Sequence, residues 1–196
     1  MKRSAKRQAR DRKAVPAPSA DAGGLRREQL RFALKFIALG GGLCLLYCSP
    51  YERSGAVGAW FHAYLGAYAK AVGAAVSLFD HTAQVSGRSI VGRFSVEIVR
   101  ECDAMQANII YVAGVVAFSA SWARRAAGVI AGLVAIGVAN VTRICALYFV
   151  GMHWPSWFEF AHESAQLFMV AAALGAFVWW AALIKPIPKG ARHVST

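Results

Sequence analysis

Residues 126–151 read AAGVIAGLVAIGVANVTRICALYFVG, an apolar run whose polar side chains are Asn140, Thr142 and Arg143. The run exceeds the roughly 20 residues that a helix needs to cross the hydrocarbon core of a bilayer. It therefore predicts a transmembrane helix and decides the class of fold. A charged side chain at or near membrane depth is costly, so Arg143 marks a candidate functional site.

The composition also indicates an integral membrane protein. The chain has 196 residues, of which 57% are hydrophobic and 16% charged, whereas soluble domains carry roughly 25% charged residues. The net charge is +12, but 11 of the 22 Lys and Arg residues lie in the first 35 residues. Such an excess beside an apolar helix is typical of a cytoplasmic flank rather than of a nucleic-acid-binding surface. The four cysteines form no CxxC pair and no Cys/His ladder, so neither a disulfide framework nor a metal site is predicted.

Three other apolar runs predict spans at Phe32–Ser49, Ala104–Ser121 and Ser164–Ile184. Each is about long enough for a core of ~30 Å. We expect residues 122–125, which include two arginines, to form a short cytoplasmic turn, because Lys and Arg are enriched on that side. Residues 153–157, which include two tryptophans, are expected to form an outer loop. Both termini are then cytoplasmic.

Residues 55–79 permit two interpretations. They are apolar enough for a span, yet they contain His62 and Lys70. If they crossed the membrane, Arg124 and Arg125 would face outward, against the positive-inside tendency. We therefore expect an interfacial helix on the outer surface, a depth that suits its Trp and Tyr side chains.

Residues 84–99 have a different period. Phe94, Val96 and Ile98 alternate with polar residues, as in a half-buried strand. Ser89–Val91 can supply the preceding strand, which predicts a small β-hairpin. This ribbon would lead directly into Cys102.

The expected fold class is an all-α integral membrane protein with about four transmembrane helices, an extracytoplasmic interfacial helix and a small β-hairpin. Residues 1–29, which are basic and lack apolar periodicity, are expected to form a disordered cytoplasmic tail. Residues 30–184 are expected to form the membrane-embedded domain, and residues 185–196 a cytoplasmic C-terminal tail.

Three reactive side chains should converge at the outer membrane surface. Cys102 precedes the second span, Arg143 lies late in the third, and His162 precedes the fourth. A thiolate is a nucleophile, an imidazole exchanges protons near neutral pH, and a guanidinium donates to an oxyanion. Asn140, one turn before Arg143, is expected to orient it, and Glu159 could orient the imidazole. This set favours acyl transfer through a thioester.

Two other classes of function stay open. Cys44 and Cys48 share a face of the first span, which suggests a membrane thiol oxidoreductase, although a helical i,i+4 pair is poorly placed for a disulfide. A non-catalytic scaffold or transport subunit is the other alternative, in which Cys102 is an inert, small hydrophobic residue.

At these residues the chain resembles the exosortase/archaeosortase family of membrane cysteine transpeptidases, most closely its short forms such as exosortase H. The resemblance covers residues 30–184. It rests on a Cys ahead of one span, Asn-x-x-Arg late in the next, and a His at the start of the last. These motifs stand as Val99-Arg100-Glu101-Cys102, Asn140-Val141-Thr142-Arg143-Ile144 and Phe158-Glu159-Phe160-Ala161-His162-Glu163. Many members have Gly soon after the Cys, whereas Asp103-Ala104 stands here.

The resemblance implies an enzyme that acts on peptide bonds without a cofactor. Its substrates would be membrane-anchored proteins with a C-terminal sorting signal, made of a short motif, one transmembrane helix and a basic tail. Cys102 would attack the scissile carbonyl, Arg143 would stabilise the oxyanion, and His162 would protonate the leaving amine. The expected setting is a bacterial inner membrane, with the site facing the periplasm. The recognition motif, the acceptor and the oligomeric state stay open.

Overall fold

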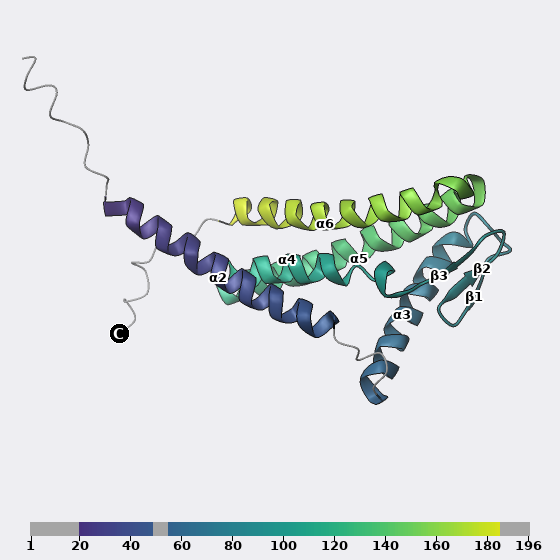
Figure 1. Ribbon diagram of the computed structural model, residues 1–196, viewed down its shortest axis with the longest axis horizontal. Coiled ribbons are helices and arrows are strands. Elements are labelled where there is room, and N and C mark those ends of the chain that lie inside the picture. Colours follow the sequence, from purple (N-terminus) through teal and green to yellow (C-terminus); the bar gives the residue numbers. More distant parts are fainter. Residues whose placement is uncertain (1–19, 49–54, 185–196) are drawn as a thin grey trace, which may run out of the picture.

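The computed structural model describes residues 20–48 and 55–184. Four helices lie alongside one another along its long axis (Figure 1): α2 (Ala20–Cys48), α4 (Met105–Ala117), α5 (Trp122–His153) and α6 (Phe158–Leu183). The short helix α4 packs against the other three, and more than half of its residues are buried. It forms the centre of the bundle.

Within the described residues, three helical segments are long and apolar enough to cross a membrane, namely Gly23–Cys48, Trp122–His153 and Pro155–Leu183. Their surfaces expose large apolar side chains, for example Ile37, Ile130 and Val178. Contiguous exposed apolar surface of this kind is stable in lipid rather than in water. The chain is a multi-pass membrane protein, as the sequence predicted.

The fourth pass differs from the expected span at Ala104–Ser121. Helix α4 has only 13 residues, about 20 Å at 1.5 Å per residue. It starts after Ala104, which has a left-handed backbone, and ends at Phe118, which is extended. The chain then bends at residues 118 and 119, and the N–H of Ala120 donates to the carbonyl oxygen of Phe118 at 3.0 Å. Helix α4 by itself is therefore shorter than a bilayer core of ~30 Å.

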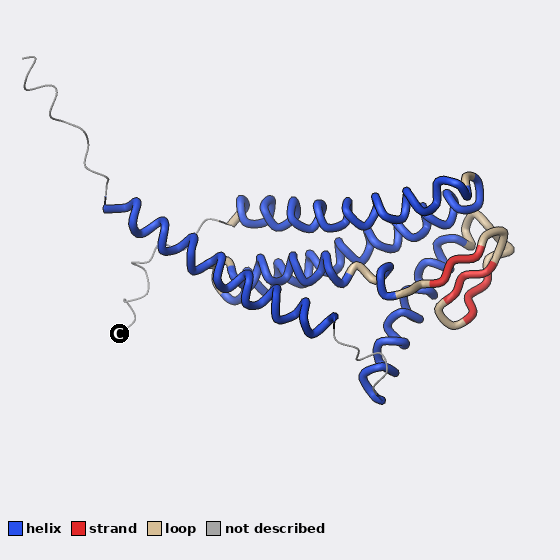
Figure 2. Tube along the Cα trace, in the orientation of Figure 1, coloured by secondary structure: helices blue, strands red, loops and turns tan. Residues whose placement is uncertain are grey.

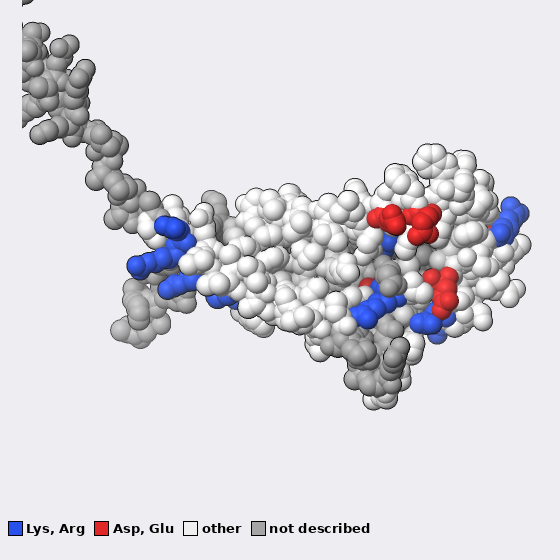
Figure 3. All heavy atoms as spheres, in the orientation of Figure 1, with Lys and Arg blue, Asp and Glu red and all other residues white. Residues whose placement is uncertain are grey.

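The distribution of charged side chains agrees with a bundle that crosses the membrane. On the face shown in Figure 3, Lys and Arg gather at the end where α2 begins. Acidic and further basic residues gather toward the other end, near α3 and the sheet, and the described surface between the two groups carries none. An uncharged belt flanked by charged ends is the pattern expected of a bundle that crosses the hydrocarbon core.

Helix α3 (Gly55–Val76) crosses the end of the bundle steeply, and a three-stranded antiparallel sheet lies beside it (Figures 1 and 2). The strands are β1 (Gln84–Ser86), β2 (Ser89–Val91) and β3 (Ser95–Glu97), in the order β1-β2-β3. Helix α3 is not among the helices long and apolar enough to span. The predicted hairpin is β2–β3, which pairs Ile90 with Val96. Strand β1 is too short and polar to give a sequence signal.

Three predicted boundaries differ from the structure. Residues 20–29, expected in the disordered tail, are the first turns of α2, because extending an existing helix costs little. Helix α5 already begins at Trp122, so Arg124 and Arg125 lie in its first turn rather than in a loop. Helix α6 begins at Phe158, which places His162 in its second turn. The other residues of the predicted tails, 1–19 and 185–196, lie outside the described residues, as does Ser49.

The carboxylate of Asp80 fastens the sheet to the bundle. It accepts hydrogen bonds from the hydroxyls of Thr82 at 2.6 Å and Tyr148 at 2.7 Å, and from the backbone N–H of Arg93 at 3.3 Å. The Thr82 hydroxyl, followed by that of Tyr148, lowers the pKa of Asp80 well below its ordinary range. Because Tyr148 belongs to α5, this carboxylate fixes the chain that leads from the sheet to Cys102.

Candidate active site

Cys102 lies in a tight turn between the sheet and α4. It is the last residue of a short 3₁₀ helix, Arg100–Cys102, and is only 5% exposed. Ala104 then has φ +56°, in the left-handed region that favours glycine. This residue turns the chain abruptly, so that α4 starts within three residues of the thiol.

Two tyrosines from other helices hold this turn. The hydroxyl of Tyr47 on α2 lies 3.2 Å from both carboxylate oxygens of Asp103 and 3.0 Å from the Arg100 carbonyl oxygen. The hydroxyl of Tyr64 on α3 donates to the Asp103 carbonyl oxygen at 3.1 Å. Burial raises the pKa of Tyr64, so this hydroxyl keeps its proton. The Asp103 carboxylate also accepts from the Met105 N–H at 2.7 Å and thereby starts α4.

The thiol of Cys102 meets the imidazole of His162. The Sγ–Nε2 distance is 3.6 Å, within range of a hydrogen bond to sulfur. The two residues are 60 positions apart in the chain, so only the packing of α4 against α6 brings them together. Phe158, one turn earlier on α6, has its ring parallel to the imidazole, with centroids 6.1 Å apart.

Asn140 connects Arg143 to the turn at Cys102. Its side chain is fully buried and donates from Nδ2 to the Cys102 carbonyl oxygen at 2.7 Å, while Oδ1 accepts from Arg143 Nη1 at 3.4 Å. Arg143 Nη2 also reaches the His162 carbonyl oxygen at 3.5 Å. One amide and one guanidinium on α5 therefore contact the main chain beside both the thiol and the imidazole.

Arg143 Nε is a buried donor without a partner among the described residues. The side chain is 6% exposed, and its Nε makes no hydrogen bond within the described part of the chain. A buried donor without a partner carries a desolvation penalty that an incoming oxygen would remove.

The structure does not bring every predicted residue into the site. Glu159 is exposed in the first turn of α6, and no hydrogen bond between it and His162 is found among the described residues. Phe158 lies against the imidazole instead. Cys44 and Cys48 are exposed, free thiols on α2. Within residues 20–48 and 55–184, no group of three His, Cys, Asp or Glu side chains could hold a metal ion.

Sequence reasoning missed the groups that support the turn. Tyr47, Tyr64 and Asp103 look like ordinary interfacial residues in the sequence, and their contacts join positions 39 to 56 residues apart. It also gave no role to Gln166, whose amide donates to the Gln106 amide oxygen at 3.3 Å. Each glutamine follows Cys102 or His162 by four residues. This second contact joins the first turn of α4 to α6, one turn after His162.

A comparison with protein families places this geometry in a known group. The family described as transmembrane exosortase matches residues 43–179, about 70% of the chain. The chain belongs to the transmembrane exosortase family. The match runs from the C-terminal end of α2 through most of α6 and includes Cys102, Arg143 and His162. Neither a curated protein nor a solved structure matches the chain.

Proposed function

We propose that this exosortase is a membrane-embedded cysteine transpeptidase or peptidase. It would cleave C-terminal sorting signals of secreted proteins through a thioester. The observation that carries the proposal is the 3.6 Å contact between Cys102 Sγ and His162 Nε2 at the end of an apolar bundle. A nucleophile and a base within hydrogen-bond reach are the arrangement that covalent acyl transfer requires.

In the proposed reaction, His162 Nε2 takes the thiol proton of Cys102, and the sulfur attacks the carbonyl carbon of the scissile bond. The carbon–nitrogen bond then breaks, and His162 returns the proton to the leaving nitrogen. The N-terminal part of the substrate stays on Cys102 as a thioester. An amine acceptor or water resolves it and regenerates the thiol. For the first step the imidazole must carry its own proton on Nδ1.

The negative oxygen of the tetrahedral intermediate needs a donor in a site that excludes water. Arg143 supports this role because its buried Nε–H has no partner among the described residues. Asn140 supports the same step as a positioning residue, since it contacts both the guanidinium and the Cys102 carbonyl oxygen. The exposed position of Glu159 gives no support to a role in orienting the imidazole.

The first test compares two sets of cysteine variants. Cys102→Ala should abolish processing of the native substrate, and mass spectrometry of the acid-quenched wild type should find a substrate fragment on Cys102. The double variant Cys44→Ala/Cys48→Ala should retain processing. Loss of activity in the double variant, with activity kept in Cys102→Ala, would instead identify a thiol oxidoreductase. Retained native function in both would favour a non-catalytic scaffold.

The proposed topology places both termini and Arg124-Arg125 in the cytoplasm, and α3, the sheet and Cys102 on the periplasmic side of a bacterial inner membrane. It rests on the excess of Lys and Arg at the α2 end of the bundle (Figure 3). Residues 30–184 are then the catalytic domain. In a cysteine-free background, an impermeant thiol reagent should label a cysteine placed at Ser86 in intact cells, but not one placed at Arg125. Labelling at Arg125 alone would invert the proposed topology.

A further inference from the structure

A groove runs between α5 and α6 beside the candidate active site. Four alanines line it, Ala139 and Ala146 on α5 and Ala161 and Ala165 on α6, together with the larger apolar side chains Leu147, Val150, Phe168 and Met169. Its volume is about 440 Å³. We call it the α5–α6 groove. It lies on two helices that are long and apolar enough to cross the membrane, so a membrane-embedded partner can reach it from the side.

The α5–α6 groove continues to the interfacial end of the bundle. A second hollow of about 450 Å³ shares Val150 and Ala161 with it and is lined by Trp154, Trp157 and Phe160. Tryptophan is enriched where a membrane meets water. The two hollows thus form a path from membrane depth to the interface.

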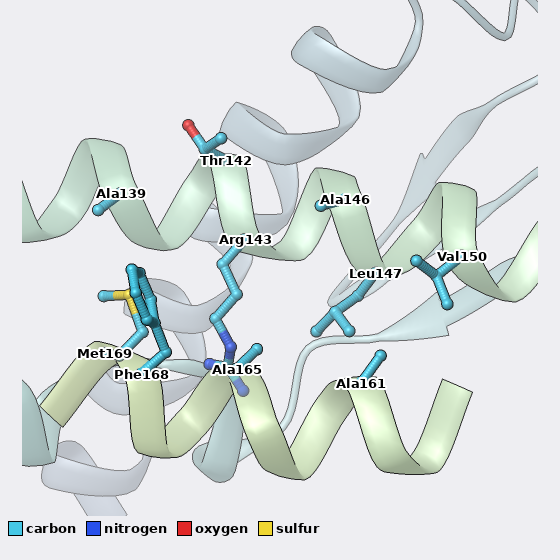
Figure 4. A pocket seen from close by; sticks show the side chains of 10 residues that line it. All are labelled: Ala139, Thr142, Arg143, Ala146, Leu147, Val150, Ala161, Ala165, Phe168 and Met169. Atoms are coloured by element: carbon cyan, nitrogen blue, oxygen red, sulfur yellow. The ribbon is translucent and has the colours of Figure 1, made fainter. Parts of the chain in front are cut away.

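Arg143 supplies the charge in the α5–α6 groove. Figure 4 shows its side chain extending from α5 across the groove toward α6, beside Ala165. Its unpartnered Nε–H belongs to the same guanidinium that contacts Asn140 and the His162 carbonyl oxygen. An apolar partner that carries an acceptor oxygen at this level would satisfy the donor and lie next to the thiol–imidazole pair.

We propose that the α5–α6 groove binds the transmembrane helix of the substrate. This inference rests on the proposed function. The helix would occupy the deeper part, between Ala139 and Ala165, and the segment before it would pass outward beside Trp154. That path presents the scissile carbonyl to Arg143.

Small side chains favour a helix over a lipid chain in this groove. Interfaces between membrane helices are enriched in small residues, because these let two backbones approach closely. Another apolar hollow, of about 490 Å³ between α2, α3 and α4, is lined by bulky residues such as Leu43, Trp60 and Phe61. Its polar group, the Tyr47 hydroxyl, already contacts Asp103. The α5–α6 groove is therefore the better receptor for a helix with a polar end.

Site-specific photo-crosslinking in the full-length protein tests this placement. In a Cys102→Ala background, which leaves the substrate uncleaved, a photoreactive amino acid at Ala146 or Ala165 should crosslink to the transmembrane segment of the bound substrate. The same amino acid at Val134 or Leu174, which are exposed on the same helices but lie on the faces away from the groove, should not. The probe is that substrate with an epitope tag, produced in the same membranes.

The possible results separate this inference from the proposed function. Leu46 and Ile109 line the hollow between α2, α3 and α4. A thioester on Cys102 combined with crosslinks from these two positions would overturn binding in the α5–α6 groove and leave the proposed reaction intact. A thioester with crosslinks from Ala146 and Ala165 to phospholipid alone would also overturn it. If no substrate forms a thioester, the proposed function and the groove both fail.

Filling the groove gives a second, kinetic test. Ala146→Leu and Ala165→Leu should each raise the KM for the membrane substrate at least about fivefold, the smaller end of what overfilling a packed contact costs. The alkylation rate of Cys102 by iodoacetamide should stay unchanged, which shows that the site is folded. Ala127→Leu, an exposed change on another face of α5, should leave both values at wild type. Unchanged KM in both groove variants would refute the placement.

Discussion

Replacing Arg143 by lysine separates an oxyanion donor from a charge that only contacts its neighbours or lipid headgroups. The guanidinium makes two long hydrogen bonds, at 3.4 Å to Asn140 and 3.5 Å to the His162 carbonyl oxygen. Bonds at the limit of the distance range are weak, and even ordinary ones contribute only about 0.5–1.5 kcal/mol each. The variant should therefore keep its fold, while its shorter, more strongly hydrated ammonium cannot reproduce the Nε donor.

The loss of one oxyanion donor typically lowers kcat by about 10²–10³, or roughly 3–4 kcal/mol. We expect Arg143→Lys to lose activity on this scale, measured as the processing rate of the native substrate normalised to membrane-inserted protein. Arg124→Lys, an exposed change in the first turn of the same helix, is the control and should keep the wild-type rate. A rate for Arg143→Lys within about threefold of wild type (under roughly 1 kcal/mol) would refute the assignment and leave Arg143 as an anchor.

Three further predictions concern thermal stability, measured by unfolding of the full chain in detergent micelles. Ala104→Gly should stay within about 1 kcal/mol of wild type, because glycine accepts the left-handed backbone but gains freedom in the unfolded chain. Ala104→Val should lose about 2 kcal/mol or more of stability through backbone strain and overpacking. Equal stabilities of the two variants would contradict the left-handed turn. Asp80→Asn should lower the melting temperature at neutral pH. Because the pKa of Asp80 in the folded protein lies below its ordinary value, the difference in melting temperature between wild type and variant should be complete above about pH 5 and shrink as pH falls below about 4. A difference that grows in acid would contradict this prediction. Gly132→Ala should destabilise by about 1–3 kcal/mol because its Cβ would overlap the Tyr111 ring, while Gly175→Ala, where the added Cβ meets nothing, is the control.

The sequence predicted which residues meet because helix ends in a bilayer are confined to two levels. Cys102 and His162 each precede an apolar run, whereas Arg143 lies late in the run between them, so the expected topology puts all three near the same membrane surface. Short connections make those runs neighbours. Their convergence follows from topology without any knowledge of side-chain packing. The same reasoning gave the interfacial helix and the β2–β3 hairpin, since period and charge are local properties of the chain.

The contacts that hold the turn at Cys102 could not be predicted from topology. The left-handed backbone at Ala104 is invisible in the sequence, because alanine is a poor indicator of that conformation. The contacts of Asp103 with Tyr47 and Tyr64 depend on how α2 and α3 rotate about their axes. Apolar runs that are exposed to lipid on several faces do not specify that rotation. Glu159 failed as a partner for the same reason, since its side of α6 is exposed.

Helix register, more than any local motif, sets the thiol–imidazole distance. The Cys102–His162 contact lies just before α4, and the Gln106–Gln166 contact lies in the first turn of α4. Sliding α4 along α6 would therefore lengthen the second contact and displace the turn that carries Cys102. Further along the pair, Gly114 on α4 lets the ring of Phe177 on α6 approach so closely that a Cβ would overlap it. A contact that tight resists sliding because packed interiors yield little. We therefore infer that the close packing of Gly114 against Phe177, several turns away, helps to maintain the distance between Cys102 and His162.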